Sequence, residues 1–147
     1  MDFKCAFAEN SHIDYIFEIE KICFPTECWS FEAIKKDILN TNTIYVVAVA
    51  DSKIVGYANA SAVCGECELN RIAVLPEFRN LKIGEALLKE VAAACKAAEN
   101  NIMFLEVRES NCRAIGLYKK FGFEKCGLRK NYYKNPTENA VLMSLKI

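Results

Sequence analysis

The amino-acid sequence predicts an α+β (mixed α/β) domain, built on a central sheet with helices packed against it. Two observations predict the antiparallel part of the sheet: residues 44–50 and 54–63 are apolar and rich in β-branched side chains, and the turn Asp51-Ser52-Lys53 joins them. A third observation predicts the mixed part, because a helical pattern over residues 83–98 separates two further apolar strands. The chain is therefore expected to begin as an antiparallel meander and to continue as alternating strands and helices.

Length and charge limit the classes of function. The chain has 147 residues, which fits one domain over residues 1–147. Apolar residues make up 52% and charged residues 26%, as in a compact globular protein. Lys plus Arg (19) balance Asp plus Glu (19), so we expect no nucleic-acid or membrane partner, and any phosphate binding must be local. A net charge near zero is compatible with a monomer or a weak homo-oligomer.

The eight cysteines are interpreted as reduced thiols of a cytoplasmic protein. The start Met1-Asp2-Phe3-Lys4 has no apolar leader segment, so the reducing cytosol is the expected compartment. The segment Cys64-Gly65-Glu66-Cys67 is a lone CxxC pair, which fits a hairpin turn better than a zinc site. The single histidine, His12, is expected at the surface in a capping turn, and we expect no metal.

The N-terminal third is predicted to contain one strand and two helices. Residues 3–8 form an apolar run suited to a strand, and Ser11 is the expected cap of a helix that continues to Cys23. The Phe24-Pro25 pair ends that helix, because proline disfavours helix in the residue before it. Ser30 is the expected cap of the second helix, over residues 31–39. Trp29, in the loop between the helices, either fills a hydrophobic gap or lines a ligand groove.

The central meander ends in a strand over residues 67–74, which follows the turn at residues 64–66. Beyond the helix at 83–98, a strand is predicted at 102–107. A right-handed crossover through that helix would place the two strands side by side and parallel. Ligands in such sheets bind at the carboxyl ends of the strands.

The last quarter of the chain is predicted to hold one helix and two strands. Glu109-Ser110-Asn111 opens the helix, which carries Tyr118 and ends at Gly122. Residues 123–128 read as a strand, 129–138 as a loop and 140–147 as a final strand.

The stretch from Asn70 to Leu88 predicts an anion site. A buried strand ends at Val74, a turn containing Pro76 follows, and a helix opens near Ile83. The N-terminus of a helix presents unpaired N–H groups and about half a positive charge, and Asn80 and Gly84 tolerate unusual backbone angles. Phosphate is the expected anion, and the alternative is that strand, turn and helix only pack together.

Glu106 and Tyr118 are the candidate catalytic residues. Glu106 lies in an otherwise apolar strand, where burial would raise the pKa of its carboxyl group toward that of a general base. The alternative is a structural ion pair with Arg71, Arg108 or Arg113. The ring of Tyr118 fits a core position, but its hydroxyl could donate a proton at the same cleft.

These features together resemble the GNAT acetyltransferases, and within them the bacterial ribosomal-protein alanine N-acetyltransferases, the RimI family. The resemblance covers nearly the whole chain and rests on Phe24-Pro25 with Trp29-Ser30, Asn70-Arg71-Ile72-Ala73-Val74, the helix opening after Arg79 at Gly84, Leu105-Glu106-Val107-Arg108-Glu109-Ser110-Asn111, Leu117-Tyr118, Phe121-Gly122-Phe123 and Arg129-Lys130-Asn131-Tyr132-Tyr133. It implies a GNAT-like fold, with about six to seven strands, a parallel pair at the cofactor cleft and about four helices.

The resemblance also implies acetyl transfer from acetyl-CoA to the α-amine of a protein N-terminus, with an Ala-initiated ribosomal protein as acceptor and no metal. It implies Glu106 as base and Tyr118 as acid. The cofactor would contact Ile72, Ala73, Val74, Arg79, Asn80, Leu81, Lys82, Ile83, Gly84, Asn111 and Tyr118. The acceptor would contact Trp29, Asn70, Arg71, Tyr132 and Tyr133.

One residue departs from the superfamily pattern. Lys82 stands where a glycine is usual in the phosphate loop, and its side chain could either obstruct the phosphate or point outward and add charge. Two other functions remain as alternatives. One is acetylation of a lysine side chain, a polyamine or another small amine, and the other is a CoA-binding module without turnover.

Overall fold

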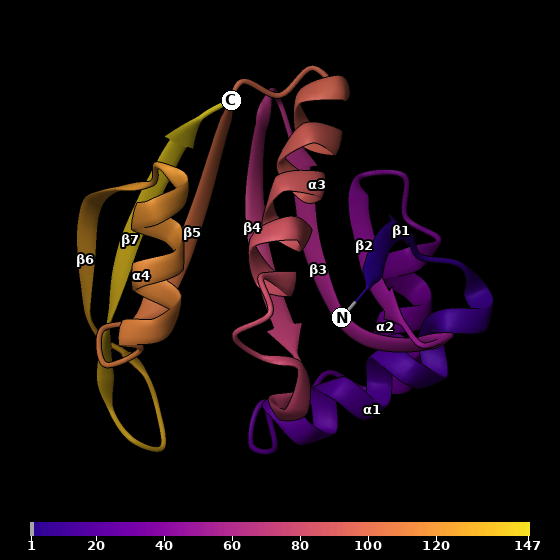
Figure 1. Ribbon diagram of the computed structural model, residues 1–147. Helices are drawn as coiled ribbons and strands as arrows, with labels where there is room; N and C mark the ends of the chain where they lie inside the picture. The colour runs from indigo at the N-terminus through magenta and orange to yellow at the C-terminus, as the bar shows by residue number, and fades with distance from the viewer. Residues whose placement is uncertain (1) are drawn as a thin grey trace.

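A computed structural model describes residues 2–147, which form one seven-stranded sheet with helices on both faces (Figure 1). The strands, in chain order, are β1 (Phe3–Phe7), β2 (Thr43–Ala50), β3 (Lys53–Val63), β4 (Glu66–Val74), β5 (Ile102–Arg108), β6 (Glu124–Tyr133) and β7 (Glu138–Lys146). The helices are α1 (Ile13–Cys23), α2 (Phe31–Ile38), α3 (Ile83–Ala97) and α4 (Cys112–Phe121), with 3-10 turns at Asn10–His12 and Pro76–Phe78.

The strand order in the sheet is β1-β2-β3-β4-β5-β7-β6, and each neighbouring pair is antiparallel except β4 and β5. This arrangement confirms the predicted mixed class and the predicted parallel pair. Helix α3 forms the crossover between the two parallel strands.

Alternate residues of the strands pack into two separate cores, one on each face of the sheet. Val46 of β2 packs in the first core with Leu87 of α3, whereas Val47 packs in the second core with Ile16 of α1. Helices α3 and α4 therefore cover one face, which we call the front face, and α1 and α2 cover part of the rear face (Figure 1).

The parallel strands β4 and β5 pair over only part of their length. Their register runs from Glu66 with Ile102 to Leu69 with Leu105, and no pairing follows. At this point β4 contains a β-bulge, because Asn59 of β3 pairs with Arg71 and Ala60 pairs with Leu69, which leaves Asn70 as the extra residue. A bulge bends its strand. The carboxyl ends of β4 and β5 consequently separate, and both cavities described below border this opening.

Several predicted helix ends are confirmed by their caps. The Ala33 N–H donates to Ser30 Oγ at 3.1 Å, and the Ala114 N–H donates to Asn111 Oδ1 at 3.2 Å. Gly122 ends α4 with φ of 118°, a conformation that favours glycine. The turn at Cys64 and Gly65 joins β3 to β4, which confirms the hairpin interpretation of the CxxC segment.

Two local predictions are wrong. Ser11 does not cap α1: the turn Asn10–His12 comes first, and its amides are satisfied by the neighbouring residues, with the Glu9 N–H donating to His12 Nδ1 at 3.0 Å. The predicted loop at 129–138 is mostly strand, since β6 continues to Tyr133 and pairs with β7 from Arg129 with Ala140 to Tyr133 with Glu138. This edge strand is polar and exposed on both faces, so it lacks the apolar alternation by which strands are identified.

Candidate functional site

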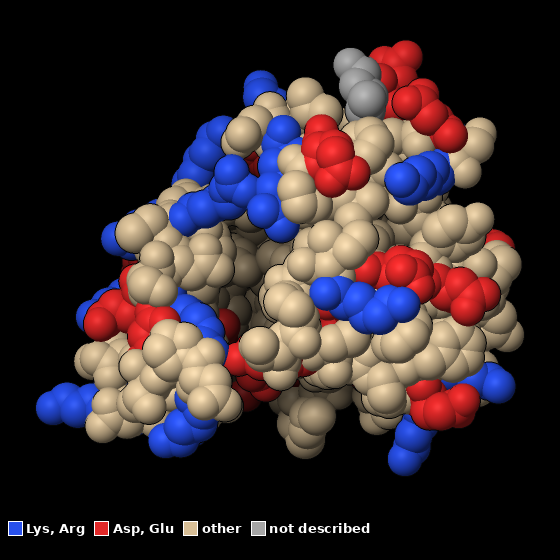
Figure 2. Space-filling view, turned by 90° about the horizontal axis from the view of Figure 1, so that it is seen from below, with Lys and Arg blue, Asp and Glu red and all other residues tan. Residues whose placement is uncertain are grey.

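Two cavities meet where β4 and β5 separate. A cavity of about 530 Å³ lies on the front face and a cavity of about 700 Å³ lies on the rear face; we call them the front cavity and the rear cavity. Figure 2 looks onto this end of the molecule and shows a hollow with Lys and Arg side chains gathered along one rim. The residues that line both cavities are Cys23, Phe24, Ile72, Asn111 and Ala114.

The front cavity contains the N-terminus of α3. Lys82 is the N-cap residue and makes no side-chain capping hydrogen bond, so the first amides of the helix have no partner from a capping side chain. Asn80 and Lys82 both have positive φ, 64° and 67°. The loop therefore adopts a left-handed conformation at Asn80, as predicted, and at Lys82 rather than at Gly84.

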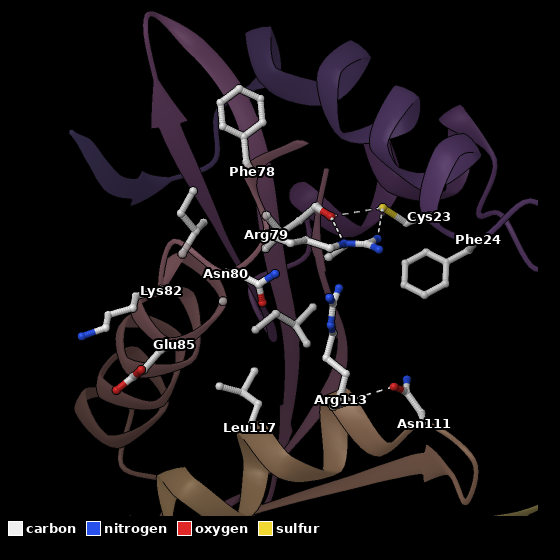
Figure 3. A pocket seen from close by; sticks show the side chains of 16 residues that line it. Cys23, Phe24, Phe78, Arg79, Asn80, Lys82, Glu85, Asn111, Arg113 and Leu117 are labelled. Atoms are coloured by element: carbon white, nitrogen blue, oxygen red, sulfur yellow. Dashed lines mark hydrogen bonds between the residues drawn. The ribbon is translucent and has the colours of Figure 1, made fainter. Parts of the chain in front are cut away.

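The side chains around this loop divide by direction (Figure 3). Lys82 points away from Arg79, Asn80 and Arg113, whereas Arg113 points from α4 toward the loop. The amides at the start of α3 and the Arg113 guanidinium thus supply positive potential to the cavity, which suits an anionic ligand. Gly84 leaves room beside them, since an added Cβ would meet only Leu117 at 3.6 Å and Val74 at 4.0 Å.

Arg79 connects the loop to the end of β4. Its Nε donates to the Val74 carbonyl oxygen at 3.0 Å, and its Nη2 lies 3.7 Å from Cys23 Sγ. Burial raises the pKa of the Cys23 thiol above its ordinary value, while Arg79 acts in the opposite direction. Cys23 is therefore a neutral thiol at the junction of the two cavities.

The structure brings most of the predicted cofactor residues together. The front cavity is lined by Ile72, Ala73, Val74, Arg79, Asn80, Lys82, Ile83, Gly84 and Asn111. Leu81 does not line it, and its side chain is exposed. Tyr118 lines the rear cavity instead.

Glu106 faces the rear cavity from β5, two residues before the end of the strand. Its side chain is 21% exposed, and its Oε1 lies 3.5 Å from Arg129 Nε on β6. Glu106 therefore both lines a cavity and forms an ion pair. Its partner is Arg129, and not Arg71, Arg108 or Arg113, which the sequence suggested.

Tyr118 reaches the rear cavity from α4. The residue is 6% exposed and packs edge-on against Phe123, with 5.7 Å between the ring centroids. Burial, and then the neighbouring Tyr133, raise the pKa of the Tyr118 hydroxyl well above its ordinary value. The hydroxyl therefore stays protonated at neutral pH, which is the form that can donate a proton.

Arg71 holds the loop between α1 and α2 against β4. Its guanidinium lies 4.1 Å from the Phe24 ring centroid and 4.4 Å from that of Trp29, and its Nη2 donates to the Glu27 carbonyl oxygen at 2.6 Å. Beneath it lies Glu20, which is fully buried. Arg71 is thus a structural residue as well as a lining residue of the rear cavity.

Glu20 is a residue that sequence reasoning missed. Its carboxylate accepts hydrogen bonds from the Trp29 N–H at 2.8 Å and from the Tyr57 hydroxyl, and it lies 3.7 Å from Arg71 Nε. These bonds satisfy a charge that would otherwise be costly to bury. Glu20 lies one helical turn after Ile16 on the buried face of α1, but its partners come from distant parts of the chain.

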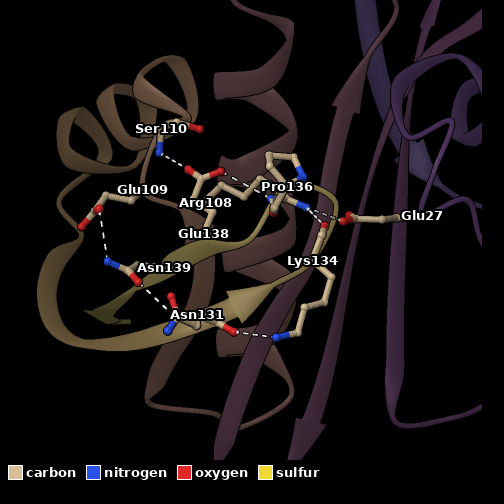
Figure 4. Close-up of polar contacts among 9 residues, drawn as sticks. All are labelled: Glu27, Arg108, Glu109, Ser110, Asn131, Lys134, Pro136, Glu138 and Asn139. Atoms are coloured by element: carbon tan, nitrogen blue, oxygen red, sulfur yellow. Dashed lines mark hydrogen bonds and ion pairs between the residues drawn. The ribbon is translucent and has the colours of Figure 1, made fainter.

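Arg108 joins three segments around the rear cavity (Figure 4). Its Nη2 lies 2.7 Å from Glu27 Oε1, and its Nη1 lies 3.4 Å from Glu138 Oε2. It also donates to the carbonyl oxygens of Lys134 and Pro136, both at 3.1 Å. Arg108 therefore fixes the turn between β6 and β7 and the loop after α1 relative to β5.

The predicted acceptor residues Trp29, Asn70, Arg71, Tyr132 and Tyr133 all line the rear cavity. Burial raises the pKa of Tyr133 to about 12. Within residues 2–147 no group of three or more side chains is placed to hold a metal ion. None of the helices in the same range is long and apolar enough to cross a membrane.

Comparisons with known proteins agree on one family. The family model described as the acetyltransferase (GNAT) family matches residues 13–123. A Bacillus subtilis protein, provisionally named a ribosomal protein bS18-alanine N-acetyltransferase, is 37% identical over 136 residues, which cover 92% of this chain and 89% of that protein. The Haemophilus influenzae protein named ribosomal protein bS18-alanine N-acetyltransferase is 32% identical over 139 residues, covering 92% and 93%.

A solved structure agrees with these relatives. The crystal structure of the ribosomal-protein-S18-alanine N-acetyltransferase from Escherichia coli superposes with a TM-score of 0.89 and 26% identity, covering 99% of this chain and 94% of that chain.

Proposed function

Because this chain belongs to the GNAT acetyltransferase family, we propose that it transfers the acetyl group of acetyl-CoA to the α-amine of a protein N-terminus. The front cavity takes the cofactor and the rear cavity takes the acceptor. The observation that carries the proposal is the position of Glu106 and Tyr118, which line the rear cavity beside the opening through which it meets the front cavity.

The front cavity fits the phosphate-bearing part of a CoA molecule. The start of α3 offers amides without a capping side chain, and Arg113 lies opposite. The backbone of β4 beyond Leu69 has no partner in β5, so its polar groups on that side are available to an extended ligand, apart from the Val74 carbonyl oxygen, which accepts a hydrogen bond from Arg79. We assign Ile72 to Val74 and Arg79 to Gly84, apart from Leu81, to this role. When bound there, acetyl-CoA supplies an activated acetyl thioester.

Glu106 acts as the general base. An amine attacks only when neutral, and at pH 7 removing its proton costs about 1 kcal/mol for an α-amine of pKa near 8 but about 4.6 kcal/mol for a lysine of pKa near 10.4. One carboxylate can accept the proton of an α-amine readily. Before the acceptor ammonium binds, the positive charge of Arg129 balances the negative charge of the Glu106 carboxylate.

Tyr118 acts as the general acid. The leaving group is a thiolate whose conjugate thiol has a pKa of about 8.5, so its departure needs only modest assistance from a hydroxyl group. The buried ring fixes the direction of the Tyr118 side chain, and its raised pKa keeps the proton available. The acceptor arrives as an ammonium and its nitrogen loses two protons: Glu106 accepts one before the attack, and the other, released as the amide forms, replaces the proton that Tyr118 gives to the leaving sulfur.

The acceptor is the N-terminus of a protein. The curated relatives are named for the alanine of ribosomal protein bS18, and we propose an Ala-initiated ribosomal protein as the acceptor of this chain as well. The aromatic rings of Trp29, Tyr132 and Tyr133 form walls of the rear cavity, which suits the first residues of a peptide. The absence of charge imbalance in the sequence favours a protein acceptor over direct contact with nucleic acid.

Steady-state rates on short peptides test this function. We expect acetylation of peptides that begin with Ala, Ser or Met, with kcat/KM highest for Ala, and little acetylation of an N-blocked peptide that contains lysine. A higher kcat/KM on the N-blocked peptide or on a polyamine would contradict the proposal. Binding of acetyl-CoA without acetylation of any amine would instead identify a binding module.

A further inference from the structure

One of the glutamates that line the rear cavity forms no ion pair. Four glutamates line the cavity, and three of them form ion pairs: Glu27 and Glu138 with Arg108, and Glu106 with Arg129. Glu68 of β4 forms no ion pair with any of residues 2–147.

The two arginines that line the rear cavity, Arg71 and Arg108, are already occupied by contacts inside the protein. Arg71 is held by Glu20 and the Glu27 carbonyl oxygen, and Arg108 by two carboxylates and two carbonyl oxygens. Neither can neutralise Glu68 without giving up these bonds. Arg129 lies near enough to lower the pKa of the Glu68 carboxyl group, but it is already paired with Glu106. Glu68 is exposed, so an incoming cation can reach it and pair with it.

Glu68 also stands at the boundary of a second hollow. A groove of about 340 Å³ runs along the rear face of the sheet over β4, β5 and β7; we call it the rear groove. Among the described residues, Glu68 and Glu106 are the ones that line both the rear cavity and the rear groove. The two carboxylates thus lie on one continuous path.

The spacing along the strands relates Glu68 to the reacting amine. Glu68 pairs with Phe104, and Glu106 lies two residues further along β5, which corresponds to roughly 6–7 Å at about 3.3 Å per residue. An extended acceptor advances by about 3.3–3.6 Å per residue, so two of its residues span this distance. When its amine is at Glu106, a side chain of its second or third residue can reach Glu68.

We infer that Glu68 is a specificity-determining residue, which selects acceptors with a lysine or arginine as their second or third residue. The inference rests on the proposed N-terminal acetyltransferase function and names a property of its acceptor. The surroundings of Glu68 support it: burial and then the Glu106 charge raise the pKa of the Glu68 carboxyl group, while Arg129 opposes them. A bound cationic side chain would add to the effect of Arg129 and stabilise the ionised carboxylate.

Peptide pairs that differ in one residue test the inference. Each peptide begins with Ala and carries Lys, Gln or Glu at residue 2, or at residue 3, and kcat/KM is measured for the wild type, Glu68→Gln and Glu68→Lys. We expect the wild type to prefer Lys over Gln by about fivefold at one of the two positions, the size of a partly exposed ion pair. The preference should fall to about onefold in Glu68→Gln, and Glu68→Lys should prefer a peptide with Glu at that position.

The control variant is Glu124→Gln, which removes the same charge at an exposed position outside both cavities and the rear groove, and should keep the wild-type ratio. Equal kcat/KM for Lys and Gln peptides in the wild type, or a preference that survives in Glu68→Gln, would overturn the inference and leave the proposed function standing. Failure of the wild type to acetylate any N-terminal peptide would overturn the proposed function and, with it, this inference.

Discussion

The Asn70 side-chain amide donates a hydrogen bond to Asn59 Oδ1 at 2.9 Å, across the β-bulge that turns β4 away from β5. The same amide donates to Ser61 Oγ at 3.1 Å. Asn59 is buried, with 1% exposure, and its own amide reaches the Ile44 carbonyl oxygen at 3.4 Å. A polar contact between neighbouring strands thus stabilises the bend that separates β4 from β5 and joins the two cavities.

Replacing Asn59 by alanine should destabilise the protein by about 1–3 kcal/mol, because this buried side chain loses its hydrogen bonds to the Asn70 amide and to the Ile44 carbonyl oxygen. Urea unfolding measures the change. Ser61→Ala is the matched control, since it removes the second acceptor at a more exposed position and should cost less than about 0.5 kcal/mol. Equal decreases in the free energy of unfolding for the two variants would show that the Asn59 contact does not stabilise the bulge more than the Ser61 contact does.

Local features of this fold could be predicted from the sequence, because the causes lie within a few residues. Ser30 and Asn111 cap helices through bonds to amides three residues ahead, and Gly122 takes the left-handed angle that ends α4. The parallel placement of β4 and β5 followed from the handedness of a crossover, which is a general rule.

Contacts between distant segments could not be predicted in this way. Glu27 and Arg108 form an ion pair although they lie 81 residues apart, and the Arg129 partner of Glu106 comes from a segment that was predicted as a loop. Charge patterns in a sequence name the available groups but not their pairing, which depends on how the strands register at the edge of the sheet. The candidate catalytic pair could be named, whereas its electrostatic surroundings could not.

Glu106→Gln should lower kcat by about 10² to 10⁴-fold, because the amide keeps the shape of the side chain but cannot accept the amine proton. The dissociation constant of acetyl-CoA should change little, since Glu106 lines the rear cavity and not the front one. Single-turnover rates with saturating acetyl-CoA measure the effect. Glu109→Gln is the control on the same segment and should retain most of the activity. Full activity of Glu106→Gln would show that another group acts as the base.

Arg108→Ala should raise the KM of the peptide acceptor by about tenfold, because it frees the turn between β6 and β7 and the loop after α1 from β5. The KM of acetyl-CoA should remain close to the wild-type value. Arg108→Lys should not restore the acceptor KM, since a single ammonium group cannot reproduce the contacts of the guanidinium fork. Lys130→Ala, at an exposed position of β6, is the control. An unchanged acceptor KM in Arg108→Ala would mean that other contacts hold these loops.

Stability should fall as pH rises from about 10 to about 12, in part because of Tyr133. Burial raises its pKa in the folded protein to about 12, whereas the unfolded chain loses this proton near its ordinary value of 10. Between these values the unfolded state binds fewer protons than the folded state, so the free energy of unfolding decreases with pH. Tyr133→Phe should show a shallower decrease in urea unfolding over this range. Identical slopes for both proteins would contradict the raised pKa.

Lys82→Gly should raise the free energy of unfolding by up to about 1 kcal/mol, because Lys82 has a left-handed conformation, φ 67°, that a glycine adopts without steric cost. The side chain points away from Arg79 and Arg113 in Figure 3, so the dissociation constant of CoA should change by less than about threefold. Calorimetry measures the binding and urea unfolding the stability. Lys82→Ala separates the two effects, since it removes the same amine but keeps the strained backbone. A tenfold tightening of CoA binding in both variants would show that the Lys82 side chain obstructs the phosphate loop.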